Sequence, residues 1–317
     1  MTTNMHNKRR LKLAAVVGIL LPLFPQSAAQ QAAIAVDTPA ESQVVTIEFE
    51  GVVGDDPFAC GETYQIGSEG TTVTPLDFRL YVSEVALLDV EGNAVPLVLE
   101  QDGLWQHQNV ALLDFEDKTG GCVNGTGETR AQVVGAVPAG EYSGLRFTVG
   151  VPFALNHIDS TLAPSPLNLT SLWWNWNFGY KFMRLDFDTS VDTALSSSFS
   201  TESATQKGTE VHAASSQAFA IHLGSVGCQL DSAQAPIRCT SPNQAEVLLP
   251  GFNPTQNVVV ADISALLADT NLSENQEGTA IGCMSSPQDS DCGGIMQNIG
   301  LPFPNRPVGE QTFFSIQ

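Results

Sequence analysis

Three of the chain's four tryptophans lie within four consecutive positions, at Trp173, Trp174 and Trp176 in the stretch LWWNWNFGYKF. One interpretation is that all three fill the core, because aromatic rings bury large apolar areas. The other is that so dense a cluster serves a purpose beyond packing. The residue types alone leave both interpretations open.

His222 is the first of two candidate metal ligands. It lies in FAIHLGS, where Phe219, Ile221 and Leu223 would share one face of a strand. His222 then points to the opposite face, beside small alanines that leave room for a larger partner. An ordinary structural histidine would fit the same pattern.

His157 is the second candidate. It follows the expected strand LRFTVGVPF in the loop LNHID, within reach of Asp159. A carboxylate in that place could accept a hydrogen bond from the imidazole and so orient it toward a metal. His157 could also be purely structural, and His107 and His212 are expected at the surface.

Common catalytic motifs are missing from the sequence. There is no GxSxG elbow, no HExxH, no P-loop and no GxGxxG between a strand and a helix. The segment DFEDKTGGC resembles part of a calcium loop but lacks the glutamate and the spacing of an EF-hand. A solvated acidic turn is the better interpretation.

The N-terminus is typical of a secretory signal peptide. A basic start from Lys8 to Lys12 precedes an apolar run up to Phe24, and small residues follow up to Ala29. We expect cleavage near Ala29, no membrane span, and a periplasmic, secreted or cell-surface protein; an uncleaved anchor is the alternative. Cleavage would make the net charge of −21 still more negative, which disfavours nucleic acid and anionic membranes as partners.

Six cysteines in an acidic, exported chain favour disulfides over thiolate metal sites. No CxxC is present, which argues against a zinc ribbon or a thioredoxin-like centre. A preference for short local loops predicts the pairs Cys228–Cys239 and Cys283–Cys292, with Cys60 and Cys122 remaining for each other. Other pairings are compatible with the sequence.

Strand patterns dominate the chain. VVTIEFE alternates Val45, Ile47 and Phe49 with polar residues, and similar runs occur in FRLYVSEVALLDV, LRFTVGV, KFMRLDFD, AFAIHLG and EVLLPGF. Short helices are expected only in ADISALLAD, with Asp262 or Ser264 as its cap, and in SPLNLTSLWW. The sequence thus predicts an all-β fold, an antiparallel β-sandwich with long decorated loops and disulfide bridges.

The expected domain organisation is simple. Residues 1–29 form the signal peptide, residues 30–43 a disordered leader without a periodic pattern, and residues 44–317 a single β domain. Within that domain, residues 189–214 are rich in Ser, Thr and Ala and are expected to form a surface insertion between two strands.

An ordered set of motifs resembles a known family. In chain order they are FACGETY, LDFRLYVSEVALL, VALLDFED, PAGEYSGLRFTVGVPFALNHID, SPLN, WWNWNFGYKFMRLDF, IHLGSVGC and a late GC before a final cysteine. Their order is far more specific than any one of them. It is similar to the MbnP-like family, whose members are also described as four-Cys motif proteins of the metallo-mystery pair.

This resemblance implies a function. Members of the family are exported copper-binding proteins encoded beside a MauG-like di-haem enzyme of the cytochrome c peroxidase type. The enzyme oxidises a tryptophan of its partner to kynurenine, and the modified protein binds copper. The chain would then be a substrate of the haem enzyme and perform no catalysis itself, with a role in copper acquisition, storage or delivery.

The resemblance also assigns residues. His157 matches the family's LNH histidine and His222 the histidine before GS, so both are expected copper ligands. Trp174 and Trp176 match the W-x-W before GYKF, and one of them, with Trp176 preferred, would supply a third donor as kynurenine; Trp173 is additional. Imidazole and aryl amine suit copper, expected as Cu(I), better than Mg²⁺ or Ca²⁺. The competing function is a structural or adhesive exported sandwich without a metal.

Overall fold

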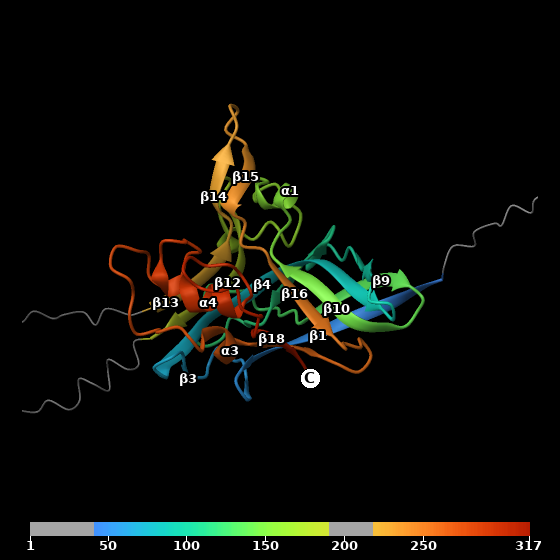
Figure 1. Ribbon diagram of the computed structural model, residues 1–317, viewed down its shortest axis with the longest axis horizontal. Helices are drawn as coiled ribbons and strands as arrows, with labels where there is room; N and C mark the ends of the chain where they lie inside the picture. Colours follow the sequence, from blue (N-terminus) through green and yellow to red (C-terminus); the bar gives the residue numbers. More distant parts are fainter. Residues whose placement is uncertain (1–40, 190–217) are drawn as a thin grey trace, which may run out of the picture. The chain divides into compact units, whose positions relative to one another are not determined.

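The computed structural model describes residues 41–189 and 218–317 (Figure 1). The predicted signal peptide, most of the predicted leader, the predicted insertion beyond Thr189 and His212 lie outside these residues. Within the two described ranges, no helix is both long enough and apolar enough to cross a membrane.

The first sheet contains both ends of the described chain. Its strand order is β18-β17-β1-β9-β6, and β2 also pairs with β1. Its strands are β1 (Ser42–Val53), β2 (Asp56–Pro57), β6 (Val98–Leu99), β9 (Gln132–Pro138), β17 (Val259–Asp262) and β18 (Phe314–Ile316). The β1–β17 pair is parallel, whereas a purely antiparallel sandwich was expected. Parallel neighbours need a long crossover, and most of the chain lies between these two strands.

The second sheet is larger and carries the candidate site. Its longest strand, β4 (Thr71–Asp89), pairs with β12 (Gly179–Asp188) along its first half and with β10 (Tyr142–Val149) along its second half. The other strands are β3 (Tyr64–Ile66), β5 (Ala94–Pro96), β7 (Gln106–His107), β8 (Val110–Asp114), β11 (Trp173–Asn175), β13 (Ala218–Gly224) and β16 (Ala245–Pro250).

A separate hairpin of β14 (Val226–Leu230) and β15 (Pro236–Ser241) projects from the larger sheet, with α1 beside it (Figure 1). The helices are short: α1 (Phe153–Asn156), α3 (Ile263–Leu267) and α4 (Gly293–Asn298), with 3₁₀ turns η1 (Thr170–Leu172) and η3 (Ser290–Cys292). Asp262 caps α3 by accepting the N–H of Ser264 at 2.8 Å, as predicted. Of the predicted helix in SPLNLTSLWW, only the 3₁₀ turn η1 forms, because the residues after it belong to β11, which pairs with β12.

The two sheets pack face to face through apolar side chains. Ile47 of β1 is fully buried, and Phe49 meets Phe147 of β10 edge-on with ring centroids 5.7 Å apart. Phe147 in turn contacts Phe314 of β18 at 5.0 Å. Each such side chain contributes roughly 1.5–3 kcal/mol on burial. The predicted all-β sandwich is therefore confirmed.

The N-terminal boundary of the described domain lies two residues earlier than expected. β1 begins at Ser42, and Ser42 and Gln43 pair with Pro138 and Val137 of β9. These two polar residues resemble leader sequence, yet backbone hydrogen bonds to β9 hold them in the sheet. The predicted leader therefore ends before residue 42.

The three predicted disulfides are all confirmed. Cys60–Cys122 joins the segment between β2 and β3 to the loop after β8. Cys228–Cys239 links directly opposed residues of the β14–β15 hairpin, and Cys283–Cys292 ties a segment that runs beside β13 to η3. No described cysteine is free. Two of the bridges thus join loop segments of the domain, and the third links the two strands of the separate hairpin.

Removal of the long Cys60–Cys122 bridge should destabilise the fold more than removal of the short Cys283–Cys292 bridge. The sequence separations are 62 and 9 residues, and all four cysteines are buried. Loss of loop-closure constraint should cost about 4 kcal/mol for the long bridge and about 3 kcal/mol for the short one. Urea unfolding of the two double Cys→Ala variants measures both costs. A larger loss for the short bridge would contradict the chain-entropy argument.

Candidate functional site

The stretch LWWNWNFGYKF folds into a hairpin, here called the tryptophan hairpin, in which β11 pairs with the start of β12. The side-chain oxygen of Asn175 closes its turn by accepting the N–H groups of Asn177 and Phe178, at 2.9 and 3.1 Å. Gly179 follows with a φ of 81°, and a Cβ there would lie 2.3 Å from the Asn156 carbonyl oxygen. Only glycine therefore fits at this position.

The three indoles of the hairpin have different environments. Trp173 packs against the core, and its buried Nε1 has no hydrogen-bond partner among the described residues. The Trp174 ring has its centroid 6.3 Å from that of Phe178 and 6.4 Å from that of His222. Trp176 lies in the turn beyond β11 and is 43% exposed. One ring thus serves the core, one lies beside a histidine, and one faces solvent.

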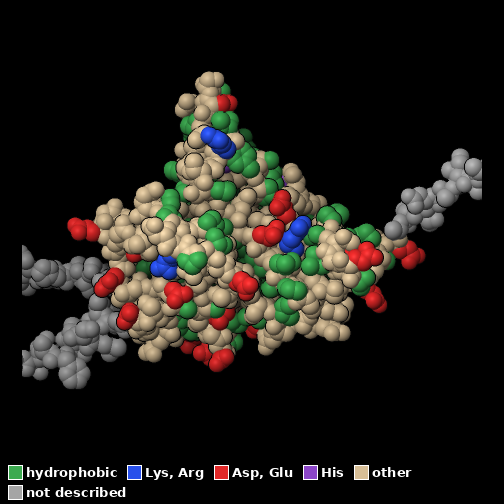
Figure 2. All heavy atoms as spheres, viewed as in Figure 1, with side chains coloured by type: hydrophobic (Ala, Val, Ile, Leu, Met, Phe, Trp, Pro, Cys, Tyr) green, Lys and Arg blue, Asp and Glu red, His purple; other side chains and the backbone are tan. Residues whose placement is uncertain are grey.

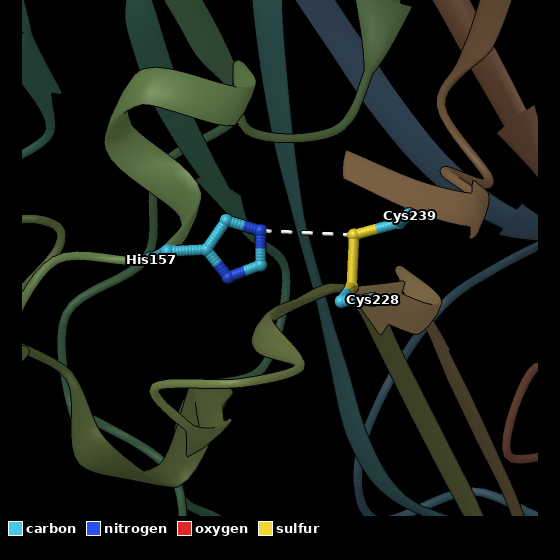
Figure 3. A group of neighbouring side chains, drawn as sticks. All are labelled: His157, Cys228 and Cys239. Atoms are coloured by element: carbon cyan, nitrogen blue, oxygen red, sulfur yellow. Dashed lines mark hydrogen bonds between the residues drawn. A yellow bond between two sulfur atoms is a disulfide. The ribbon is translucent and has the colours of Figure 1, made fainter. Parts of the chain in front are cut away.

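His157 follows α1, and its imidazole points toward the Cys228–Cys239 disulfide (Figure 3). Its Nδ1 lies 3.0 Å from the Trp176 carbonyl oxygen. Because a carbonyl can only accept, Nδ1 carries the proton and Nε2 keeps a lone pair. That Nε2 lies 3.3 Å from Asn156 Nδ2 and 3.8 Å from Cys239 Sγ. Burial lowers the pKa of His157, although the bond to the carbonyl partly opposes this, so a neutral ring is favoured.

Asp159 does not take the role expected for it beside His157. Its exposed carboxylate accepts the N–H of Thr161 at 2.9 Å and the Thr161 hydroxyl at 2.7 Å. A turn of this kind satisfies the carboxylate locally. The acceptor that orients His157 is instead the main-chain carbonyl of Trp176, which no side-chain pattern in the sequence could reveal.

Asn156 is a buried positioning residue that the sequence interpretation missed. Its Oδ1 accepts the N–H of Tyr180 at 2.8 Å, and its Nδ2 lies 3.4 Å from both the Phe178 carbonyl oxygen and Ser225 Oγ. Since His157 comes next in the chain, these bonds fix the main-chain position from which the imidazole extends. The sequence signal was its place immediately before the histidine in LNHID.

His222 lies on β13, whose alternating burial places Ile221 in the core and His222 on the other face. Its Nε2 lies 2.9 Å from Asp186 Oδ1. A carboxylate only accepts, so Nε2 is the protonated nitrogen and Nδ1 keeps a lone pair. Burial lowers the pKa of His222, and the bond to Asp186 opposes the shift. His222 is thus held in one tautomer.

Asp186 belongs to a buried chain of charges on β12 and β4, which sequence reasoning also missed. Arg184 Nε lies 2.7 Å from Asp186 Oδ2 and 3.2 Å from Asp77 Oδ2, and Arg79 Nε donates to Asp77 Oδ1 at 2.8 Å. Burial by itself would raise the pKa of Asp186, but the hydrogen bond and charge of His222 and the charge of Arg184 outweigh it and lower the pKa. The ionised carboxylate is a fixed acceptor for His222.

Two clusters of potential metal ligands are closed by disulfides. The described ranges contain two groups whose ligand atoms lie within 4.8 Å of one another, namely His157 with Cys228 and Cys239, and Glu116 with Cys60 and Cys122. In both groups the sulfurs are bonded to each other. A metal binds cysteine as the thiolate, so neither cluster is a metal site in the oxidised protein.

A cavity of about 570 Å³ opens beside the tryptophan hairpin. Its apolar wall includes Trp174, Phe178, Val226, Met284 and Pro287. None of the described side chains that line it is charged. Such a cavity suits an apolar or soft ligand better than a hard cation, which needs several oxygen donors.

Both candidate histidines contact the tryptophan hairpin, although through different atoms. His157 contacts the main chain of Trp176, and the His222 ring lies beside the Trp174 ring. Among the described residues, no hydrogen bond or ring contact joins the two imidazoles. His107, on β7, contacts Gln108 instead.

These features define a class of protein: a disulfide-linked β-sandwich in which two histidines, each with one unprotonated ring nitrogen, lie against a tryptophan hairpin. The chain belongs to the MbnP family, since a sequence model described as MbnP matches residues 42–285. Among solved structures it is similar to MbnP from Methylosinus trichosporium, at 29% identity and a TM-score of 0.69, over 87% of this chain and 98% of that one. Comparison with curated protein sequences gave no match. The family resemblance of the ordered motifs is confirmed.

Asp186→Asn should lower the pKa of His222 further. The substitution removes the carboxylate that favours the protonated ring, while Lys181 and Arg184 remain and disfavour it. NMR titration of the imidazole resonances measures this pKa. In the control Asp159→Asn, the titration of His222 should be unchanged, because Asp159 bonds only Thr161 among the described side-chain contacts. A raised pKa of His222 in Asp186→Asn would contradict the assigned role of the carboxylate.

Proposed function

We propose that this chain is an exported copper-binding protein that serves as the substrate of a di-haem enzyme and performs no catalysis itself. The observation that carries the proposal is the placement of two histidines, in an MbnP-family fold, against one tryptophan hairpin. The three disulfides agree with export to an oxidising compartment, as the N-terminal pattern does.

The available donor atoms fit copper. His157 offers Nε2 and His222 offers Nδ1, and in both rings the pKa is lowered, so neither nitrogen carries a proton at neutral pH. A metal on His157 Nε2 would replace the contact of that nitrogen with Asn156 Nδ2. Two imidazoles alone form a weak site, and a third nitrogen would strengthen it. An aryl amine on the tryptophan hairpin would supply such a donor, and nitrogen donors favour copper over Mg²⁺ or Ca²⁺.

Oxidation of one tryptophan would create this amine. Cleavage of the indole C2–C3 bond adds two oxygen atoms, which two equivalents of peroxide supply as they are reduced to water. Hydrolysis then releases C2 as formate and leaves a ketone beside an aryl amine, which is kynurenine. A MauG-like di-haem enzyme of the cytochrome c peroxidase type is the proposed catalyst, and this chain contributes only the ring.

The contacts favour Trp174 over Trp176 as the residue that becomes the donor. The Trp174 ring lies beside His222 and lines the cavity, whereas Trp176 contacts His157 only through its main chain. The Trp176 side chain is the more exposed of the two and is the easier ring for an external enzyme to reach. Proximity to a second donor supports Trp174, because a ligand must reach the metal that the histidines would hold.

The surface charge suits a basic partner. The chain has 34 acidic and 13 basic residues. Figure 2 shows acidic side chains scattered over the visible face, with few lysines and arginines among them. Opposite charge speeds the encounter of two proteins, so we propose that the haem enzyme presents a basic patch to this chain.

Loss of either candidate histidine should weaken copper binding. His157→Ala and His222→Ala should each lower the affinity at least about tenfold, since even a partner of a metal ligand is worth roughly 10–100-fold. His107→Ala is the matched control and should bind as the unsubstituted chain does. Competition with a chromogenic chelator measures the affinities, and thermal unfolding checks the fold. Equal affinity in all three variants would remove both histidines from the site.

Only the hairpin should carry the oxidation. In protein produced together with the haem enzyme, mass spectrometry of the peptide with WWNWNFGYK should show the loss of one carbon and the gain of one oxygen. Trp174→Phe should abolish that mass change and weaken copper binding. Trp176→Phe should still show the mass change and should bind copper as the unsubstituted chain does. Protein produced without the enzyme should keep unmodified rings. An unmodified hairpin after co-production would rule out the haem-pair mechanism for this chain.

A further inference from the structure

A parallel backbone bridge brings the segment that carries Met284 beside β13. Ile221 pairs with Cys283: the Cys283 N–H donates to the Ala220 carbonyl at 2.8 Å, and the His222 N–H donates to the Cys283 carbonyl at 2.9 Å. Paired residues of parallel segments point to the same side, and Ile221 and Cys283 are both buried in the core. Met284 directly follows Cys283 and His222 directly follows Ile221, so the two residues come next on adjacent segments.

The segment that carries Met284 is held firmly at this register. The Ser285 hydroxyl donates to the His222 carbonyl at 2.8 Å and accepts the Gly224 N–H at 2.9 Å. On the other side of Met284, Cys283 is fixed by its disulfide to Cys292. Bonds on both flanks hold the main chain at Met284 in place.

Trp174 lies near both Met284 and His222. Trp174 and Met284 line the same cavity, and the Trp174 ring lies beside the His222 ring. A Cβ at residue 224 would lie 2.5 Å from Trp174 Cζ3, so the glycine there allows the indole to rest on β13. The three side chains come from parts of the chain far apart in sequence.

The donor atoms of His222 and Met284 and the lining of the cavity all suit a soft metal ion. Asp186 occupies Nε2 of His222, which leaves Nδ1 as the nitrogen able to bind a metal. A thioether is a soft ligand that suits Cu(I) and offers little to hard cations. The uncharged lining of the cavity gives a hard cation no carboxylate to replace its water.

We propose that Met284 Sδ is a further copper ligand beside His222, and that it makes the site selective for Cu(I) over Zn(II). This inference rests on the proposed copper function and names a ligand that the His157, His222 and kynurenine set lacks. Met284 acts by direct coordination, whereas Asp186 acts only by positioning His222.

The test compares Met284→Leu with the unsubstituted full chain, both produced with the haem enzyme. Leucine keeps the size and apolar character of methionine but has no sulfur. Met296→Leu, at a buried position in α4, is the matched control. Copper K-edge absorption spectroscopy of the Cu(I)-loaded proteins should show sulfur scattering that only Met284→Leu loses. Chelator competition should show that Met284→Leu lowers the Cu(I) affinity about tenfold, the lower end of the range for groups that support a metal site. The Zn(II) affinity of this variant should be unchanged.

The possible results are distinguishable. If Met284→Leu binds Cu(I) as tightly as the unsubstituted chain and no sulfur scattering is seen, while His222→Ala loses the metal, Met284 is not a ligand and the copper function stands. If the unsubstituted chain with its oxidised tryptophan binds no copper, both proposals fail. Thermal unfolding of each variant separates loss of a ligand from loss of the fold.

Discussion

The candidate site depends on a buried charge that must be paired. Asp77 and Arg79 lie fully buried on β4, in the middle of the larger sheet. A charge in such a place is tolerated only with close partners, and removal of one partner leaves the other uncompensated. Arg184 joins this pair to Asp186, and Asp186 holds His222. The ring orientation of His222 is therefore fixed from the interior of the sheet and not by its surface neighbours.

His157 is positioned by different means on the other side of the tryptophan hairpin. It is not on a strand, so the loop after α1 must be held by specific bonds. Asn156 binds the start of β12, and the close approach of Asn156 to Gly179 leaves no room for a side chain. The Trp176 carbonyl then sets the tautomer of His157. A strand and a loop fixed by hydrogen bonds thus present one unprotonated imidazole nitrogen each.

The disulfides restrain the segments around the site and do not offer ligands. Cys228–Cys239 links the strands of the hairpin that His157 faces (Figure 3). Cys283–Cys292 holds the segment that runs beside His222. Sulfur and imidazole lie close enough in one of these places to resemble a metal cluster. Because the cysteines are oxidised, their sulfurs are not available as thiolate ligands.

The sequence by itself predicted an all-β sandwich, a preferred pairing of the cysteines and the family. Alternating burial in segments such as β1 follows from the period of a strand, and short cysteine loops favour local pairing, so both are local properties. The resemblance of the ordered motifs to the family pointed to His157, His222 and the tryptophans. Only the tertiary structure decided which atoms face these rings. The parallel pairing of β1 with β17, the bond from Asp186 to His222, the Trp176 carbonyl in place of Asp159, and Met284 beside β13 all join residues through strand register or main-chain atoms. Such contacts depend on how distant segments are packed, and no spacing along the chain encodes them.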